Sequence, residues 1–153
     1  MMERVLCVCV GNLSRSPMMQ AVLQQHLGAA FRVESAGVSQ ELAGRPANHR
    51  SVACMKERGI DLSGHVSRWI GDLDLDQYRW IVCVGHDEAD TVRSALGADP
   101  ASVMVANADH GGIPDPYDLG LTGYRDCLAL LDQVMPPVAQ QISGASLAST
   151  NGR

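Results

Sequence analysis

The chain has 153 residues, of which 46% are hydrophobic and 19% charged, a composition typical of one globular domain with room for a core. Its formal net charge of −5 argues against nucleic acid and anionic membranes as partners, because both attract broad positive surfaces. No stretch approaches the roughly 18 apolar residues that span a bilayer, so we expect no membrane insertion.

Strand and helix patterns alternate along the chain. Short apolar runs rich in Val and Ile predict buried strands, and apolar residues at helical spacing predict helices. In chain order we expect a strand at 5–10, helix at 17–28, strand at 31–35, helix at 50–58, short strand near Ser67, strand at 79–84, helix at 87–96 and strand at 102–106. This order predicts a single α/β domain with a central four-stranded, mainly parallel sheet and helices on both faces.

The chain ends in a predicted amphipathic helix at residues 123–142. The pair Pro136-Pro137 should kink or break this helix, because proline lacks the backbone donor and clashes with the preceding turn. Residues 144–153 are mostly small and polar, and we expect them to form a flexible tail. The domain is therefore expected to span residues 1–143.

The segment after the first predicted strand reads Cys9-Val-Gly-Asn-Leu-Ser-Arg-Ser-Pro17. The carboxyl ends of parallel strands are where α/β folds bind ligands. Gly11 and Asn12 tolerate the positive φ angles of a loop whose N–H groups surround an anion. Arg15 adds a two-pronged cation, and the helix that begins near Pro17 directs its positive end at the same place. The segment therefore predicts a phosphate-binding loop.

The same donors would stabilise the thiolate form of Cys9, as they do for cysteines at helix N-termini and beside cations. A thiolate held against a phosphoryl group is a nucleophile toward phosphorus. The hydroxyl of Ser16 can either cap the helix or hydrogen-bond the sulfur, and the sequence leaves both open. The plain alternative is a buried cysteine six residues before an arginine, a common coincidence.

This loop resembles the signature of the low-molecular-weight protein tyrosine phosphatases, Cys-x-Gly-Asn-x-Cys-Arg-Ser-Pro, and the likeness covers about residues 3–143. It continues in the motifs Glu34-Ser-Ala-Gly37, Gly59-Ile-Asp-Leu-Ser-Gly-His65 and Ile113-Pro-Asp-Pro-Tyr117. The resemblance implies hydrolysis of phosphotyrosine in proteins through a phosphocysteine, with Cys9 as nucleophile, Arg15 as phosphoryl ligand, and no metal or cofactor. It assigns phosphate binding to Val10, Gly11, Asn12, Leu13, Ser14 and Ser16.

A leaving phenolate needs a proton donor on the far side of phosphorus. The resemblance assigns this role to Asp115, which two prolines flank in a stiff loop. It places Ser35 and His65 behind the loop as supports of Asn12. Tyr117 would line the pocket mouth and stack on the substrate ring.

The chain departs from the family pattern in the signature loop and at the pocket wall. Ser14 replaces the second cysteine of the signature, so the usual disulfide that protects the nucleophile cannot form. Many relatives carry an aromatic wall residue where this chain has Glu41 and Leu42. Leu42 would offer an apolar contact, and Glu41 would repel acidic phosphopeptides.

Two other functions compete. An arsenate reductase of the same fold would relay oxidation through two more cysteines about seven residues apart, but Asp90 stands at that spacing from Cys83. A non-catalytic phosphate-binding module would usually have lost the nucleophile, the arginine or the acid.

The cellular setting follows from the cysteines and the resemblance. Five cysteines without a repeating spacing predict free thiols in a reducing cytoplasm. The likeness is greatest to bacterial members, several of which act opposite tyrosine kinases of exopolysaccharide export. We therefore expect a phosphotyrosine protein, such as a kinase of that kind, as partner, and inorganic phosphate or vanadate as inhibitors.

Overall fold

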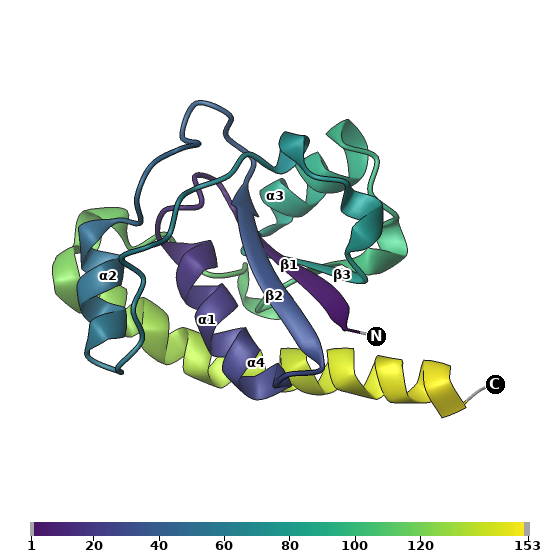
Figure 1. Ribbon diagram of the computed structural model, residues 1–153. Coiled ribbons are helices and arrows are strands. Elements are labelled where there is room, and N and C mark those ends of the chain that lie inside the picture. The colour runs from purple at the N-terminus through teal and green to yellow at the C-terminus, as the bar shows by residue number, and fades with distance from the viewer. Residues whose placement is uncertain (1, 152–153) are drawn as a thin grey trace.

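The computed structural model describes the backbone of residues 2–151 and the side chains of residues 2–146. Its four strands are β1 (Glu3–Cys9), β2 (Phe31–Gly37), β3 (Trp80–Cys83) and β4 (Val103–Val105). They form one sheet in the order β2-β1-β3-β4, and every pairing is parallel. This confirms the predicted α/β fold, with strand bounds close to those expected (Figure 1).

Helices cover both faces of the sheet, so β1 is buried from both sides. On one face lie α1 (Arg15–Leu27), α2 (His49–Lys56) and α4 (Gly120–Asn151). The other face is covered by α3 (His86–Asp90) with the π-helical turn after it and the segment around Ile70. Alternate residues of β1 belong to the two cores: Cys7 and Cys9 to the first, Leu6 and Val8 to the second, as the two-residue period of a strand requires.

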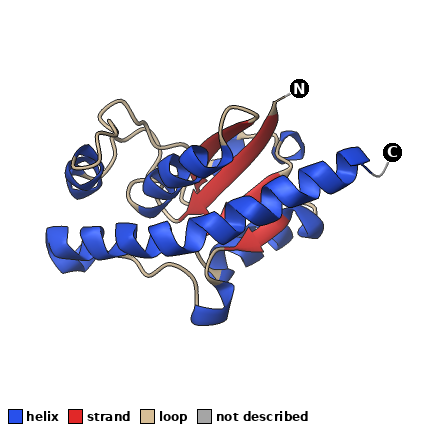
Figure 2. Ribbon diagram, turned by 90° about the horizontal axis from the view of Figure 1, so that it is seen from below, coloured by secondary structure: helices blue, strands red, loops and turns tan. Residues whose placement is uncertain are grey.

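The last helix differs from the sequence-based expectation. It continues through Pro136 and Pro137 without a break, and Figure 2 shows it running across one face of the sheet. Met135 and Val138 on either side of the prolines are buried in the core, so tertiary packing outweighs the loss of backbone donors. The helix also runs beyond residue 143 to Asn151, where the composition predicted a flexible tail. The domain boundary at 143 stays a prediction.

The expected short strand near Ser67 is reduced to two isolated bridges, Gly37 with Trp69 and Pro46 with Val66. These bridges hold residues 66–69 beside the end of β2. Among the helices of the described residues, none is long and apolar enough to cross a membrane.

Candidate active site

The loop between β1 and α1 lies at the carboxyl end of the central strand β1. Asn12 has a φ of 58°, in the left-handed region where asparagine is better tolerated than most residues. The loop passes very close to Gly37 at the end of β2: a Cβ there would lie 2.6 Å from the carbonyl oxygen of Val10. Gly37 is therefore required by the close approach of two backbones.

Cys9 is buried, with 3% of its surface exposed, and its sulfur has two polar neighbours. The backbone N–H of Asn12 donates to Sγ at 3.2 Å, and the hydroxyl of Ser16 lies 2.9 Å from it. The question left open for Ser16 is thus answered: α1 begins at Arg15, its N-cap is Ser14, and no side chain caps it. The Ser16 hydroxyl bonds the sulfur instead.

Asn12 is completely buried and uses its whole side chain. Its Nδ2 donates to the hydroxyls of Ser16 and Ser35, each at 2.9 Å, and its Oδ1 accepts from the backbone N–H of Arg68 at 2.9 Å. Its carbonyl oxygen lies 2.7 Å from Nε2 of His65. The structure therefore brings Ser35 and His65 to the back of the loop, both in contact with Asn12.

Two members of this network were not anticipated. Oε1 of Gln20 on α1 accepts a hydrogen bond from the Ser35 hydroxyl at 2.6 Å. Arg68 contributes its backbone N–H, which donates to Asn12. Helical spacing places position 20 near the loop but does not reveal its partner, and a backbone donor leaves no trace in residue type.

Burial lowers the pKa of His65; the charge of Arg68 acts in the same direction, while the hydrogen bond to Asn12 opposes it. A neutral imidazole with its proton on Nε2 suits this place, because the carbonyl oxygen of Asn12 can only accept. His65 thus holds the loop backbone from behind.

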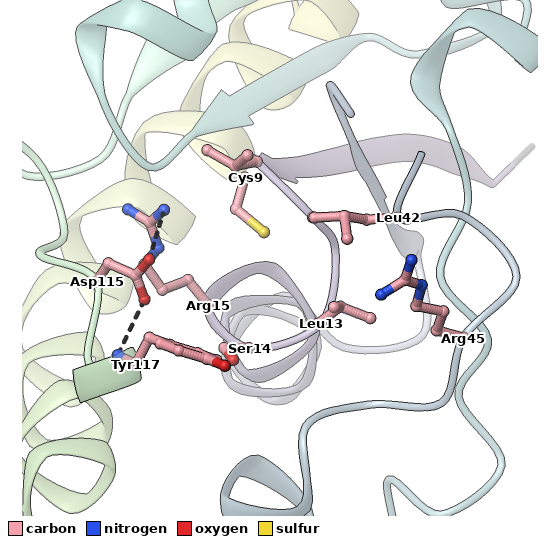
Figure 3. A pocket seen from close by; sticks show the side chains of 10 residues that line it. Cys9, Leu13, Ser14, Arg15, Leu42, Arg45, Asp115 and Tyr117 are labelled. Carbon is pink, nitrogen blue, oxygen red and sulfur yellow. Dashed lines mark hydrogen bonds and ion pairs between the residues drawn. The ribbon is translucent and has the colours of Figure 1, made fainter. Parts of the chain in front are cut away.

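In front of the loop lies a cavity of about 320 Å³ (Figure 3). It is lined by Cys9, Val10, Gly11, Leu13, Ser14, Arg15, Leu42, Arg45, Asp115 and Tyr117. Leu42 and Tyr117 line this cavity. Glu41 is exposed, and the structure places it outside the lining. Arg45, four residues later, lines the cavity instead.

The side chains of Arg15 and Asp115 lie next to each other on one side of this cavity (Figure 3). Nη1 of Arg15 donates to the carbonyl oxygen of Ile113 at 2.9 Å, and Nη2 lies 3.9 Å from Oδ2 of Asp115. The other carboxylate oxygen accepts the backbone N–H of Tyr117 at 3.1 Å. The Asp115 side chain is 57% exposed, so its carboxyl group can exchange protons with solvent.

Ser14 stands where the family signature has its second cysteine, and it forms a hydrogen bond instead of a disulfide. The hydroxyl of Ser14 lies 2.9 Å from the phenol of Tyr124 on α4, which ties the loop to the last helix.

All five cysteines are free and buried. Burial raises the pKa of the Cys7 thiol well above its ordinary value, and it raises the pKa of Cys127 to about 12. Within residues 2–146 no cluster of His, Cys, Asp or Glu side chains could hold a metal ion.

Comparison with known proteins agrees with this geometry. The sequence model of the low molecular weight phosphotyrosine protein phosphatases matches residues 4–146. A probable low molecular weight protein-tyrosine-phosphatase of Ralstonia solanacearum, EpsP, is 31% identical over 87% of this chain and 91% of that protein.

Solved structures agree as well. Wzb of Vibrio vulnificus in complex with benzylphosphonate has a TM-score of 0.81 at 26% identity, over 92% of this chain and 99% of that one. The YwlE arginine phosphatase of Geobacillus stearothermophilus has a TM-score of 0.79 at 25% identity, over 95% and 96% of the two chains.

The family model covers nearly the whole chain. This chain belongs to the low molecular weight phosphotyrosine protein phosphatases, a family of cysteine-dependent hydrolases that need no metal.

Proposed function

We propose that this chain hydrolyses aryl phosphomonoesters, and phosphotyrosine in proteins above all, through a phosphocysteine intermediate. The observation that carries the proposal is the Cys9 sulfur at the base of a cavity that Arg15 and Asp115 also line. The N–H of Asn12 and the hydroxyl of Ser16 stabilise negative charge on that sulfur.

In the first step the thiolate of Cys9 attacks phosphorus in line. An S–P bond forms as the bond between phosphorus and the phenolic oxygen breaks, and that oxygen takes a proton from the carboxyl group of Asp115. Arg15 and the loop N–H groups balance the charge on the three transferring oxygens.

In the second step a water molecule attacks the phosphocysteine. The carboxylate of Asp115, now deprotonated, accepts a proton from that water. The S–P bond breaks, inorganic phosphate leaves, and Cys9 returns to a thiolate. Because product phosphate fits the same loop, we expect phosphate and vanadate to inhibit competitively.

The cavity walls favour a flat apolar leaving group. Leu13 and Leu42 lie on one side, and Tyr117 lies on the other (Figure 3). Burial of a phenyl ring between such side chains is favourable. A phosphoserine side chain is too short to place its peptide against these walls while its phosphate occupies the loop.

The test is hydrolysis of para-nitrophenyl phosphate by the purified protein. We expect turnover by the wild type, none by Cys9→Ser, and vanadate binding by both, since the oxygen nucleophile is far weaker while the loop donors remain. Activity that survives in Cys9→Ser would falsify the mechanism. A phosphoarginine peptide tests the arginine phosphatase activity named for the Geobacillus protein. We expect this chain to hydrolyse a phosphotyrosine peptide faster than a phosphoarginine peptide.

The physiological part of the proposal is that this enzyme acts in the cytoplasm on a bacterial tyrosine kinase of exopolysaccharide export. It rests on the likeness to bacterial members of the family. Deletion of the gene should raise tyrosine phosphorylation of that kinase, and complementation with the Cys9→Ser variant should not reverse the rise. Unchanged phosphorylation after deletion would exclude the kinase as a substrate.

A further inference from the structure

We propose that Arg45 forms a second anion-binding point at the mouth of the active-site cavity and selects phosphotyrosine substrates that carry a carboxylate beside the phosphotyrosine. The inference rests on the proposed phosphatase function and names a substrate class for it. The carboxylate is that of a Glu or Asp residue in the substrate chain.

Arg45 lines the same cavity as the nucleophile Cys9, on the wall opposite Asp115. It lies with Leu13 and Leu42 on one side, while Asp115 and Tyr117 lie on the other (Figure 3). A phosphotyrosine whose phosphate reaches the base of the cavity would place its ring between these walls. The residues that flank the phosphotyrosine would then pass over the rim, within reach of Arg45.

The guanidinium of Arg45 is available for such a partner. Nη2 donates to the carbonyl oxygen of Glu41 at 3.3 Å, and no carboxylate of residues 2–146 lies within ion-pair distance of it. Arg15, by contrast, already contacts Ile113 and Asp115. A guanidinium presents five donors in a planar fork that matches a carboxylate, so most of the Arg45 fork has no partner among residues 2–146.

The backbone beneath Arg45 is held firmly by Ser67, which is only 3% exposed. The Ser67 hydroxyl accepts the N–H of Arg45 at 3.0 Å and donates to the carbonyl oxygen of Leu42 at 2.6 Å. The backbone N–H of Ser67 donates to the Arg45 carbonyl oxygen at 2.8 Å. These bonds fix the point from which the side chain extends, which reduces the entropy lost on binding.

The charges around the cavity make this recognition selective. Asp115 is the one carboxylate among its lining residues, and it belongs to the opposite wall. Glu41 is exposed and outside the lining, so its repulsion of an acidic substrate is screened by solvent. The chain as a whole carries −5, so the positive charge of Arg45 would attract an acidic peptide at a point on a molecule that repels it overall.

The test compares phosphotyrosine peptides that differ only by Glu or Gln at one position, scanned over three residues on either side of the phosphotyrosine. Within each enzyme variant, the ratio of kcat/KM for the Glu peptide to that for the Gln peptide cancels any general loss of activity. Because exposed ion pairs are weak, we expect the wild type to favour Glu about two- to fivefold at one position.

Three variants decide the outcome. Arg45→Ala should bring that ratio to about one, and Arg45→Lys should leave an intermediate ratio, because lysine keeps the charge without the fork. Arg32→Ala is the charge control: it removes the same charge from an exposed side chain on β2 that pairs with Glu34 at 3.4 Å and lies outside the active-site cavity, and it should keep the wild-type ratio.

Salt gives a second readout, because the Debye length shrinks from about 10 Å at 0.1 M to about 3 Å at 1 M ionic strength. The wild-type preference for the Glu peptide over the Gln peptide should therefore fall as the ionic strength rises. A Glu-to-Gln ratio that is the same in wild type and Arg45→Ala at every position would overturn the proposal, as would a wild-type preference for Gln. Wild-type failure to hydrolyse para-nitrophenyl phosphate would instead overturn the phosphatase function itself.

Discussion

The back of the phosphate loop and the rim of the cavity are built in opposite ways. Behind the loop, Asn12 and Ser35 are buried, and hydrogen bonds with Ser16, Ser35, His65 and Arg68 hold Asn12 in addition to its bond to the Cys9 sulfur. At the rim, the Asp115 side chain is 57% exposed and Tyr117 is 61% exposed. The part that holds the phosphoryl group is therefore rigid, while the part that meets the leaving group and the substrate chain is open to solvent and to variation.

The largest effect is expected at the rim, where a substitution should change the reaction rate and leave the stability of the fold unchanged. Asp115→Asn should slow aryl esters with poor leaving groups about 10²- to 10⁴-fold, because the proton donor is lost. An amide oxygen can still accept the N–H of Tyr117, so the loop should keep its shape. The measurement is kcat over a series of aryl phosphates of graded leaving-group acidity.

Esters with very acidic leaving groups should lose far less, since they depart without a proton. Equal losses across the series would remove Asp115 from the role of acid. The Tm of this variant should stay near that of the wild type, because an exposed ion pair at 3.9 Å contributes little stability.

Behind the loop, Asn12→Ala should reduce both stability and activity. It removes the hydrogen bond from Asn12 to Ser35, leaves the N–H of Arg68 without its partner, and puts alanine at a φ of 58°. We expect a loss of about 2–4 kcal/mol, which lowers the Tm by about 5–15 °C in a domain of this size. Thermal unfolding measures it directly.

Asn12→Gly is the matched control, because it removes the same hydrogen bonds but tolerates the positive φ. It should therefore be less destabilised than Asn12→Ala. If both variants were as stable as the wild type, the contrast between a rigid back and an open rim would be wrong.

A smaller effect is expected at Glu34, just before Ser35. Burial raises the pKa of Glu34, but hydrogen bonds from Arg4, Tyr78 and Arg68 together outweigh burial and lower the pKa. The stability that this carboxylate contributes is therefore complete above the ordinary glutamate pKa of about 4.3 and is lost as the pH falls below it.

Glu34→Gln at neutral pH should lower the Tm by about 3–6 °C. The gap between variant and wild type should narrow as the pH is lowered from about 5 to 3, which unfolding curves over this range would measure. A gap that widens toward acid would reverse the sign assigned to Glu34.

Residue types and spacing were informative where the residues are neighbours in the chain, whereas Ser35 and His65 were placed behind Asn12 only through the family resemblance. Cys9, Asn12 and Arg15 share one loop, so their types and spacing already predicted its chemistry. Arg45 and Gln20 escaped notice because each gains its place from an element distant in sequence: Ser67 for the first, Ser35 for the second. Pro136 and Pro137 misled for the same reason, since burial of their neighbours against the sheet overrides a local helix-breaking preference.

By itself, the sequence determined the α/β fold class and predicted a phosphate loop after the first strand, because strand and helix periods and a strand-loop-helix junction are local properties. Only the tertiary structure decided that the Ser16 hydroxyl meets the Cys9 sulfur instead of capping the helix, that Gln20 and Arg68 join the network around Asn12, and that Arg45 rather than Glu41 lines the cavity mouth. Those choices depend on how β2, the segment at 65–68 and the loop before α2 pack against one another, and packing between distant segments leaves no periodic trace in the chain.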